Sequence, residues 1–341
     1  MRRLLALAIC AISFSASSAL GQTLINGAGS SFAYPLYSKW TAEYSAIDKS
    51  VHFNYQSIGS GGGIAQIIAR TIDFGATDAP MSDQELAKTA PILHLPTALG
   101  AVVITYNLPG SPALKLTPEV IADIFLGKIT SWNDAAIAAV NPSVALPNTP
   151  IAVVHRSDGS GTTYVFTDYL AKVSPTWAKD VHVGKAVHWP AGTGAKGNEG
   201  VTGQVTQLPG AIGYVELAYA FQNKIPVAAI RNQSGAFVSP SVASVTAAAA
   251  AASKAMPADM RVSITNADGA ASWPIAAFTY VLVYREQTDP ARGPTLIKFL
   301  RWGNHDGQKF CEPLLYAPLP ASIVKMVDAK LDSVTLNGKK I

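Results

Sequence analysis

The sequence predicts an α/β protein of two domains whose sheets are mainly parallel. Strand-like segments are repeatedly followed by a loop of Gly, Ser, Thr or Asp residues and then by a helix-like segment. Strands that alternate with helices form parallel sheets, and ligands bind at the carboxyl ends of such strands, where these loops would lie. The length of 341 residues allows two domains with separate cores. Two long β-prone segments, residues 100–107 and 278–284, are expected to cross between them.

The first 21 residues are typical of a secretory signal peptide that is cleaved after Gly21. A basic start precedes an apolar run over residues 4–12 and then a segment of small residues. Four serines between residues 13 and 18 end the apolar run well short of a bilayer span, which argues against a membrane anchor. We therefore expect an exported protein.

The composition argues against disorder and against nucleic-acid binding. Hydrophobic residues make up 49% and charged residues 14% of the chain, which is typical of a folded protein. The formal charge of +4 includes two arginines of the signal peptide, so +4 − 2 leaves about +2, with no run of Lys or Arg. Once Cys10 is removed with the signal peptide, Cys311 has no disulfide partner, and we expect it to be a buried apolar residue.

The first quarter of the chain shows the strand–loop–helix order twice. A strand at residues 23–26 leads through a glycine–serine loop into a helix with Pro35 in its first turn, where proline is tolerated. The apolar positions of that helix are Phe32, Leu36, Tyr37, Trp40 and Tyr44. An alternating strand at residues 51–55 is followed by a glycine-rich loop and a helix through residue 68, and residues 72–80 then give a short strand and a turn.

The middle of the chain is expected to form the second domain. Residues 118–128 predict a helix, and the alanine run at residues 247–252 predicts a surface helix rather than a low-complexity segment. No repeat of 20–50 residues is visible, which excludes a solenoid.

Residues 151–170 have the composition of an anion-binding cradle. Four apolar residues predict a short strand, and apolar spacing from Val165 onward predicts a helix. The loop between them contains Arg156, whose guanidinium matches a tetrahedral oxyanion, together with hydroxyl donors and two glycines that let the backbone approach a ligand. The first turn of the helix adds unpaired N–H groups and the positive end of its dipole. An N-capped turn that binds nothing is the alternative, which this stretch alone leaves open.

Six segments of the chain carry a family resemblance. They are residues 26–32 (NGAGSSF), 55–62 (YQSIGSGG), 73–80 (DFGATDAP), 126–132 (LGKITSW), 156–162 (RSDGSGT) and 208–214 (LPGAIGY). In this order and spacing, the chain resembles the phosphate-binding proteins of bacterial phosphate ABC importers from about residue 24 to its C-terminus.

The resemblance implies a periplasmic binding protein fold of two lobes, each a mainly parallel sheet flanked by helices, joined by two crossing strands. Lobe 1 would comprise residues 22–103 and 275–341, and lobe 2 residues 104–274. Such a protein binds one inorganic phosphate in the cleft between the lobes and delivers it to the membrane permease subunits of the importer. It would be a periplasmic monomer with no enzymatic activity and no cofactor.

The resemblance also implies the contacts with phosphate. These would be made by Ser31, Phe32 (through its backbone N–H), Ser60, Asp78, Arg156, Ser160, Gly161 and Thr162. Asp158 would hold the Arg156 guanidinium from behind. A carboxylate can only accept a hydrogen bond, so Asp78 suits an anion that carries a proton, as hydrogen phosphate does and sulfate does not. His155, next to Arg156, is interpreted as structural.

Two other functions fit the sequence less well. A secreted phosphoryl- or acyl-transfer enzyme is disfavoured because the chain lacks a Gly-x-Ser-x-Gly motif, and Ile129 after Gly127-Lys128 breaks the phosphate-loop pattern. The six histidines show no spacing typical of metal ligands, so no metal site is expected. A receptor for sulfate or molybdate is the other alternative, and Asp78 argues against it.

Overall fold

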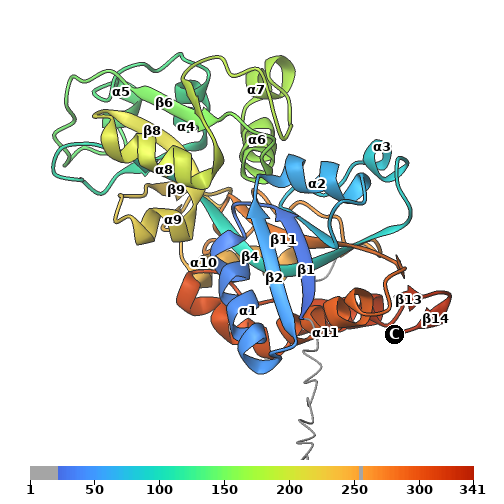
Figure 1. Cartoon of the computed structure of the whole chain (residues 1–341). Helices are drawn as coiled ribbons and strands as arrows, with labels where there is room; N and C mark the ends of the chain where they lie inside the picture. The colour runs from blue at the N-terminus through green and yellow to red at the C-terminus, as the bar shows by residue number, and fades with distance from the viewer. Residues whose placement is uncertain (1–21, 253–255) are drawn as a thin grey trace, which may run out of the picture.

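The structure is a computed structural model that describes residues 22–252 and 256–341 (Figure 1). The predicted signal peptide, residues 1–21, lies outside the described residues. An eight-stranded sheet with the strand order β2-β1-β3-β11-β4-β8-β6-β7 forms the centre of the protein. Its strands are β1 (Thr23–Gly29), β2 (Val51–Ser57), β3 (Phe74–Thr77), β4 (Ile92–Tyr106), β6 (Ala152–Arg156), β7 (Thr193–Ala195), β8 (Ala211–Glu216) and β11 (Ala276–Tyr284).

The fifteen-residue strand β4 joins the two halves of this sheet. Its residues 92–101 pair with β11 and its residues 102–106 pair with β8. Figure 1 shows one lobe around β1, β2 and β11 and a second lobe around β6 and β8. Strands β1, β2 and β3 are parallel, as are β6, β7 and β8, whereas β4 and β11 run antiparallel to their neighbours. The predicted α/β fold of two lobes with mainly parallel sheets is confirmed.

Of the two segments expected to cross, residues 100–107 run from one lobe to the other along β4, whereas residues 278–284 lie in β11 and pair only with β3 and the first part of β4. The chain passes back to the first lobe beside β4, just before β11 begins. Two hydrogen bonds place residues 273–275 next to Val102: Val102 N donates to the carbonyl of Ile275, and Trp273 Nε1 donates to the carbonyl of Val102. From Ala276 onward, β11 lies between β3 and the first part of β4. The return connection therefore runs through residues 273–275.

Four helices begin shortly after a parallel strand ends. They are α1 (Tyr34–Ile47) after β1, α2 (Ser60–Ile68) after β2, α6 (Gly161–Val173) after β6, and α8 (Gly197–Gln207) after β7. Within each lobe the parallel strands end at one edge of the sheet, so the N-termini of the helices that follow them gather at that edge. The sequence pattern predicted the first three of these helices.

The remaining elements flank the two halves of the sheet. The helices are α3 (Asp83–Leu86), α4 (Pro118–Phe125), α5 (Ala135–Ala138), α7 (Pro175–Asp180), α9 (Leu217–Gln222), α10 (Val242–Ala252), α11 (Arg292–Asn304) and α12 (Ala321–Leu331), with short 3₁₀ helices at Asp306–Phe310 and Glu312–Leu314. Two small sheets are formed by β5 (Lys115–Leu116), β9 (Ala229–Arg231) and β10 (Phe237–Val238), and by β12 (Glu286–Gln287), β13 (Thr335–Leu336) and β14 (Lys339–Lys340).

Aromatic side chains fill the core of both lobes. In the first, Trp40 of α1 is buried and donates through Nε1 to the carbonyl of Gly307, so α1 packs on the C-terminal segments. In the second, Phe166 of α6 stacks on Tyr214 of β8 with 4.4 Å between ring centroids. Cys311 is buried as predicted, and burial raises the pKa of its thiol to about 12.

The alanine-rich segment is helical, as predicted, and forms the second half of α10. Val245 and Ala248 of this helix are fully buried, and α10 packs against β4 and β11. The helix predicted at residues 118–128 is shorter than expected, since α4 ends at Phe125 and Gly127 adopts a positive φ of 74°. No helix within the described ranges has the length and apolar character needed to span a membrane.

Candidate anion-binding site

The helix N-termini of the two lobes meet at a partly buried point where backbone contacts backbone. Gly61 N, in the first turn of α2, donates to the carbonyl of Gly159 at 2.7 Å, just before α6 begins. A side chain on Gly161 would overlap the Ser60 hydroxyl and the Asp78 carboxylate. The glycines of both loops are therefore required by this close approach.

Asp78 lies at the carboxyl end of β3 with only 3% of its surface exposed. Its Oδ1 accepts hydrogen bonds from Ser30 Oγ and from Thr279 Oγ1, each at 2.7 Å. Its Oδ2 accepts from Ser60 Oγ at 3.4 Å. Burial raises the pKa of Asp78 to about 6, although these hydroxyls and the positive charge of Arg156 act in the opposite direction. A buried carboxylate of this kind offers a ligand an acceptor and no donor.

Arg156, at the end of β6, is also 3% exposed and is held by Asp158 in a bidentate pair. Arg156 Nε and Nη2 donate to the two carboxylate oxygens at 2.7 and 2.6 Å, so Nη1 remains to face the cradle. Nη1 lies 3.3 Å from Thr162 Oγ1. The guanidinium and its hydrogen bonds lower the pKa of Asp158. Asp158 therefore fixes the guanidinium as the resemblance implied.

The first turn of α6 supplies unpaired donors beside this guanidinium. Ser160 caps the helix, since its Oγ accepts from Thr163 N at 2.9 Å. Within the described ranges no protein acceptor takes the N–H of Gly161 or of Thr162. The capping interpretation thus holds for Ser160, and it leaves two N–H groups and the helix dipole directed into the cradle.

The loop between β1 and α1 faces α6 from the other lobe. Among the described residues, none accepts a hydrogen bond from the N–H of Ser31 or of Phe32. The carbonyls that share peptide planes with these two N–H groups are held in place, that of Ser30 by Tyr55 OH and that of Ser31 by Tyr219 OH, each at 2.7 Å. Fixed carbonyls keep the peptide N–H groups directed at the cradle.

All the residues predicted from the sequence therefore lie around one buried point between the lobes. Their part in binding stays a prediction. His155 lies outside the cradle: its ring stacks on Trp189 at 4.8 Å and Nδ1 bonds the carbonyl of Arg156, which fits the structural role assigned to it.

Comparison with known proteins identifies the family. Residues 15–303 match the PBP superfamily domain. The phosphate-binding protein PstS of Xylella fastidiosa strain 9a5c is 50% identical over 309 residues, covering 89% of this chain and 84% of that protein. The PstS of Pasteurella multocida is 46% identical over 321 residues, covering 93% of each chain. The chain belongs to the PstS family of phosphate-binding proteins.

Solved structures agree with this assignment at the level of the fold. A high-affinity periplasmic phosphate-binding protein, PfluDING, solved with phosphate bound, has a TM-score of 0.73 at 24% identity and covers 90% of this chain and 93% of its own. A phosphate-binding protein of Stenotrophomonas maltophilia has a TM-score of 0.66 at 20% identity, covering 90% and 93%. PstS-family membership thus accounts for the two-lobed architecture.

Three residues around the cradle of this PstS-family chain were missed in the sequence. Ser30 and Thr279 hold Asp78, and Asn198 of α8 bonds Ser31 and Thr162. Ser30 lies inside residues 26–32, one of the segments that carry the resemblance, so its hydroxyl could have been identified as part of the site. Thr279 and Asn198 come from segments in which no local pattern marks a ligand site.

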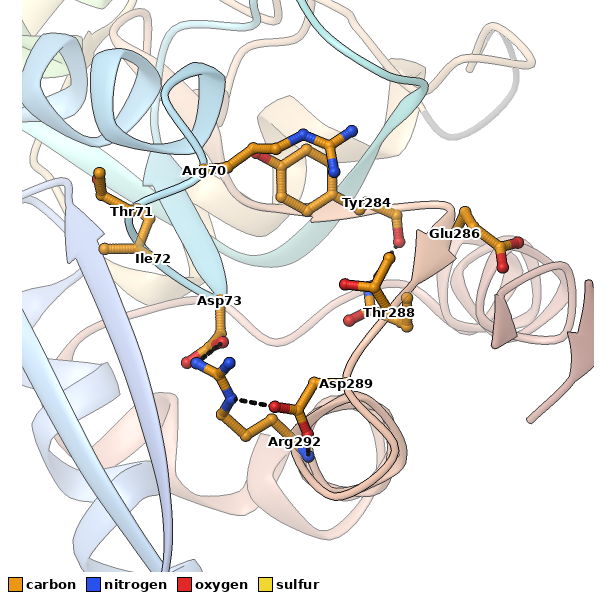
Figure 2. A pocket seen from close by; sticks show the side chains of 10 residues that line it. Arg70, Thr71, Ile72, Asp73, Tyr284, Glu286, Thr288, Asp289 and Arg292 are labelled. Atoms are coloured by element: carbon orange, nitrogen blue, oxygen red, sulfur yellow. Dashed lines mark hydrogen bonds and ion pairs between the residues drawn. The ribbon is translucent and has the colours of Figure 1, made fainter. Parts of the chain in front are cut away.

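A surface pocket of about 170 Å³ lies elsewhere on lobe 1 (Figure 2). Figure 2 shows Arg292 between Asp73 and Asp289, and it bonds these carboxylates at 3.0 and 2.8 Å. The Arg70 guanidinium lies 4.9 Å from the centre of the Tyr284 ring. Because Arg292 is already paired with Asp73 and Asp289, this pocket is less suited to a charged ligand than the cradle is. The described residues hold no cluster of side chains that could bind a metal ion.

Proposed function

We propose that this chain binds inorganic phosphate between its two lobes and delivers it to the permease of a phosphate ABC importer. The observation that carries the proposal is the combination of donors with the buried carboxylate of Asp78. Arg156 and the N-termini of α1, α2 and α6 surround Asp78, which is 3% exposed. The names of the 46–50% identical relatives support the same ligand.

The charge balance of the cradle suits a partly protonated anion. The Arg156 cation is already paired with Asp158, so the ligand's charge would be balanced largely by N–H dipoles and hydroxyls. Hydrogen phosphate carries one proton near neutral pH, and that proton can be donated to Asp78. Sulfate has no proton there and would bring its lone pairs against the carboxylate.

We assign residues 22–103 and 275–341 to lobe 1 and residues 104–274 to lobe 2. The exchange of partners along β4, from β11 to β8 after residue 101, supports the first boundary. The return connection at residues 273–275 supports the second. With these boundaries, phosphate would be bound by Ser31, Phe32, Ser60 and Asp78 of lobe 1 and by Arg156, Ser160, Gly161 and Thr162 of lobe 2.

The cellular setting follows from the same family membership. We assign the chain to the periplasm, reached by cleavage of the predicted signal peptide, where a monomer would carry phosphate to the permease subunits. We infer that it binds and releases phosphate without converting it, because the relatives are named as binding proteins.

Calorimetric titration of the mature protein, stripped of bound phosphate by unfolding and refolding, tests this function. Phosphate should bind at one site per chain, and sulfate at the same concentrations should give no saturable heat. Phosphate at 100 times its Kd should also stabilise the fold by about 2.7 kcal/mol. Equal binding of both anions would indicate a general oxyanion receptor. Sustained turnover of a chromogenic phosphate ester would indicate an enzyme instead.

A further inference from the structure

Asn198 is a fully buried residue at the start of α8 that contacts both lobes of the candidate site. Its side-chain nitrogen Nδ2 donates to Ser31 Oγ at 2.9 Å and to Thr162 Oγ1 at 3.1 Å. Both acceptors belong to the proposed phosphate contacts, and they come from opposite lobes. Asn198 itself is not among those contacts.

The orientation of the Asn198 amide is determined by its oxygen. Oδ1 accepts a hydrogen bond from the backbone N–H of Glu216 at 2.9 Å. A backbone N–H can only donate, so the amide oxygen must face Glu216 and the NH₂ group must face the two hydroxyls. The two hydrogens of that NH₂ group match its two acceptors.

These bonds leave the hydroxyls of Ser31 and Thr162 able to form one further hydrogen bond each, as a donor. A hydroxyl has one hydrogen to donate and two lone pairs that accept. Ser31 Oγ accepts from Asn198 Nδ2 and also from Asn198 N, at 3.2 Å. Thr162 Oγ1 accepts from Asn198 Nδ2 and from Arg156 Nη1. With both lone pairs occupied, each hydroxyl can only donate to a ligand.

Resting on the proposed function, we propose that Asn198 is a positioning residue that fixes Ser31 and Thr162 as donors to bound phosphate. The proton of the ligand is then directed to Asp78, because neither hydroxyl can accept it. The arrangement forms only where Ser31 and Asn198 meet, so it is completed as the lobes close. When the donors of a site are already oriented before the ligand binds, no binding free energy is lost in orienting them.

The nearly isosteric Asn198→Asp variant reverses the hydrogen-bond polarity at this position. A carboxylate there accepts from the two hydroxyls, which turns their hydrogens away from phosphate and adds a negative charge. Calorimetric titration should give a phosphate Kd at least 100-fold weaker than that of the wild type. A Kd within threefold of the wild type would overturn the role of Asn198.

Asn141→Asp is the matched control. Asn141 is also buried, and its side chain makes three hydrogen bonds, to Lys115 N, Lys115 O and Ile137 O, within lobe 2 and away from the cradle. The control should lower the melting temperature and leave the phosphate Kd within twofold of the wild type. If Asn141→Asp weakened binding as much as Asn198→Asp, general destabilisation would explain both results and the proposal would fall.

A double-mutant cycle separates positioning from packing and uses the milder Asn198→Ala variant in case the aspartate does not fold. Asn198→Ala should weaken phosphate binding about tenfold in the wild-type background. It should cost less than threefold when Ser31→Ala and Thr162→Val are already present, because the hydroxyls through which it acts are gone. Equal costs in both backgrounds would overturn the proposal. A wild type that binds no phosphate would overturn the proposed function itself, whereas equal costs beside a binding wild type would overturn only the role of Asn198.

Discussion

Arg156 is the residue whose loss should weaken phosphate binding most directly. Arg156→Ala removes the cation of the cradle and leaves the Asp158 carboxylate, 2.6 Å from it in the wild type, without its partner. Truncating one partner of a buried, hydrogen-bonded charge pair costs about 2–5 kcal/mol, so the Kd should rise by about 30-fold or more. Calorimetric titration measures this.

Arg231→Ala is the control for this change. Arg231 pairs with Glu119 at 2.9 Å on the surface, where both side chains are exposed. Exposed pairs contribute little, so this variant should bind phosphate like the wild type. An Arg156→Ala variant with an unchanged Kd would remove Arg156 from the site.

Asp78 should determine the selectivity of the site. Asn is nearly isosteric, carries no charge and offers an N–H to a sulfate oxygen, so Asp78→Asn should retain much of the phosphate affinity and admit sulfate. A site built around one specific hydrogen bond rejects the analogue that lacks it by roughly 10⁴–10⁵-fold. A competition assay with labelled phosphate and rising sulfate, run on both proteins, measures the change. Equally poor competition with both would show that another group discriminates.

The same carboxyl should give the unliganded protein a distinctive pH dependence. Burial raises the pKa of Asp78 from 3.8 to about 6 in the folded protein. Between these values the folded state binds the extra proton, so stability falls as pH rises, by about 3 kcal/mol at 1.36 kcal/mol per pKa unit. Asp78→Asn lacks this loss, and because only part of it falls between pH 4 and pH 7, the stability of the variant relative to the wild type should increase by about 2 kcal/mol over that range.

Urea unfolding in phosphate-free buffer at several pH values tests this dependence. Carboxyls whose pKa is lowered, such as Asp158, change stability in the opposite direction, but they are common to both proteins and cancel in the difference. A difference that stays constant from pH 4 to pH 7 would contradict the raised pKa of Asp78.

At the scale of elements, the start of α6 determines how closely the two lobes can approach. Alanine is a better helix former than glycine, so Gly161→Ala should not destabilise α6. Its methyl group would nevertheless overlap Ser60 Oγ and Asp78 Oδ2 of the opposite lobe. We expect a folded protein whose phosphate Kd is about 100-fold weaker, because the lobes cannot close over the ligand.

The matched control for Gly161→Ala is Gly203→Ala in α8. A methyl group on Gly203 would have no atom within 4 Å, so this variant should bind phosphate normally and be slightly more stable. Thermal melts and titrations of both variants separate helix stability from lobe closure. Normal binding by Gly161→Ala would show that the cradle tolerates a wider separation of α6 and Asp78.

The strand–loop–helix units could be predicted from the sequence because their signals are local. The buried positions Leu36, Tyr37, Trp40 and Tyr44 of α1 follow helical spacing, and each cradle loop lies between a strand and a helix. The residues that support the cradle from a distance could not be found this way. Thr279 is 201 residues from Asp78, in a strand buried on both faces where alternation gives no signal. The contacts of Asn198 depend on how the two lobes meet.

At the scale of the whole molecule, binding and closure of the lobes are separable. Lys185 of lobe 2 pairs with Glu85 of lobe 1 at 2.7 Å, with about a fifth of each side chain exposed. The backbone carbonyl of Lys185 accepts from Ser160 N at 2.8 Å, and this contact survives a change of the side chain. The ion pair therefore stabilises the closed arrangement without being among the proposed contacts to the ligand.

Lys185→Met should accordingly weaken the binding of every ligand of the closed form by the same factor. Partly exposed ion pairs contribute up to about 1 kcal/mol, so the phosphate Kd should rise about fivefold at low salt and less at high salt. The preference for phosphate over sulfate should stay as in the wild type, because Asp78 and Arg156 are untouched.

Lys39→Met is the control, since Lys39 pairs with Glu43 inside α1 and cannot report on closure. Titrations of both variants at two salt concentrations decide the matter. A changed preference in Lys185→Met would show that the rim of the cleft takes part in recognition, and an unchanged Kd would show that the closed form does not depend on this pair.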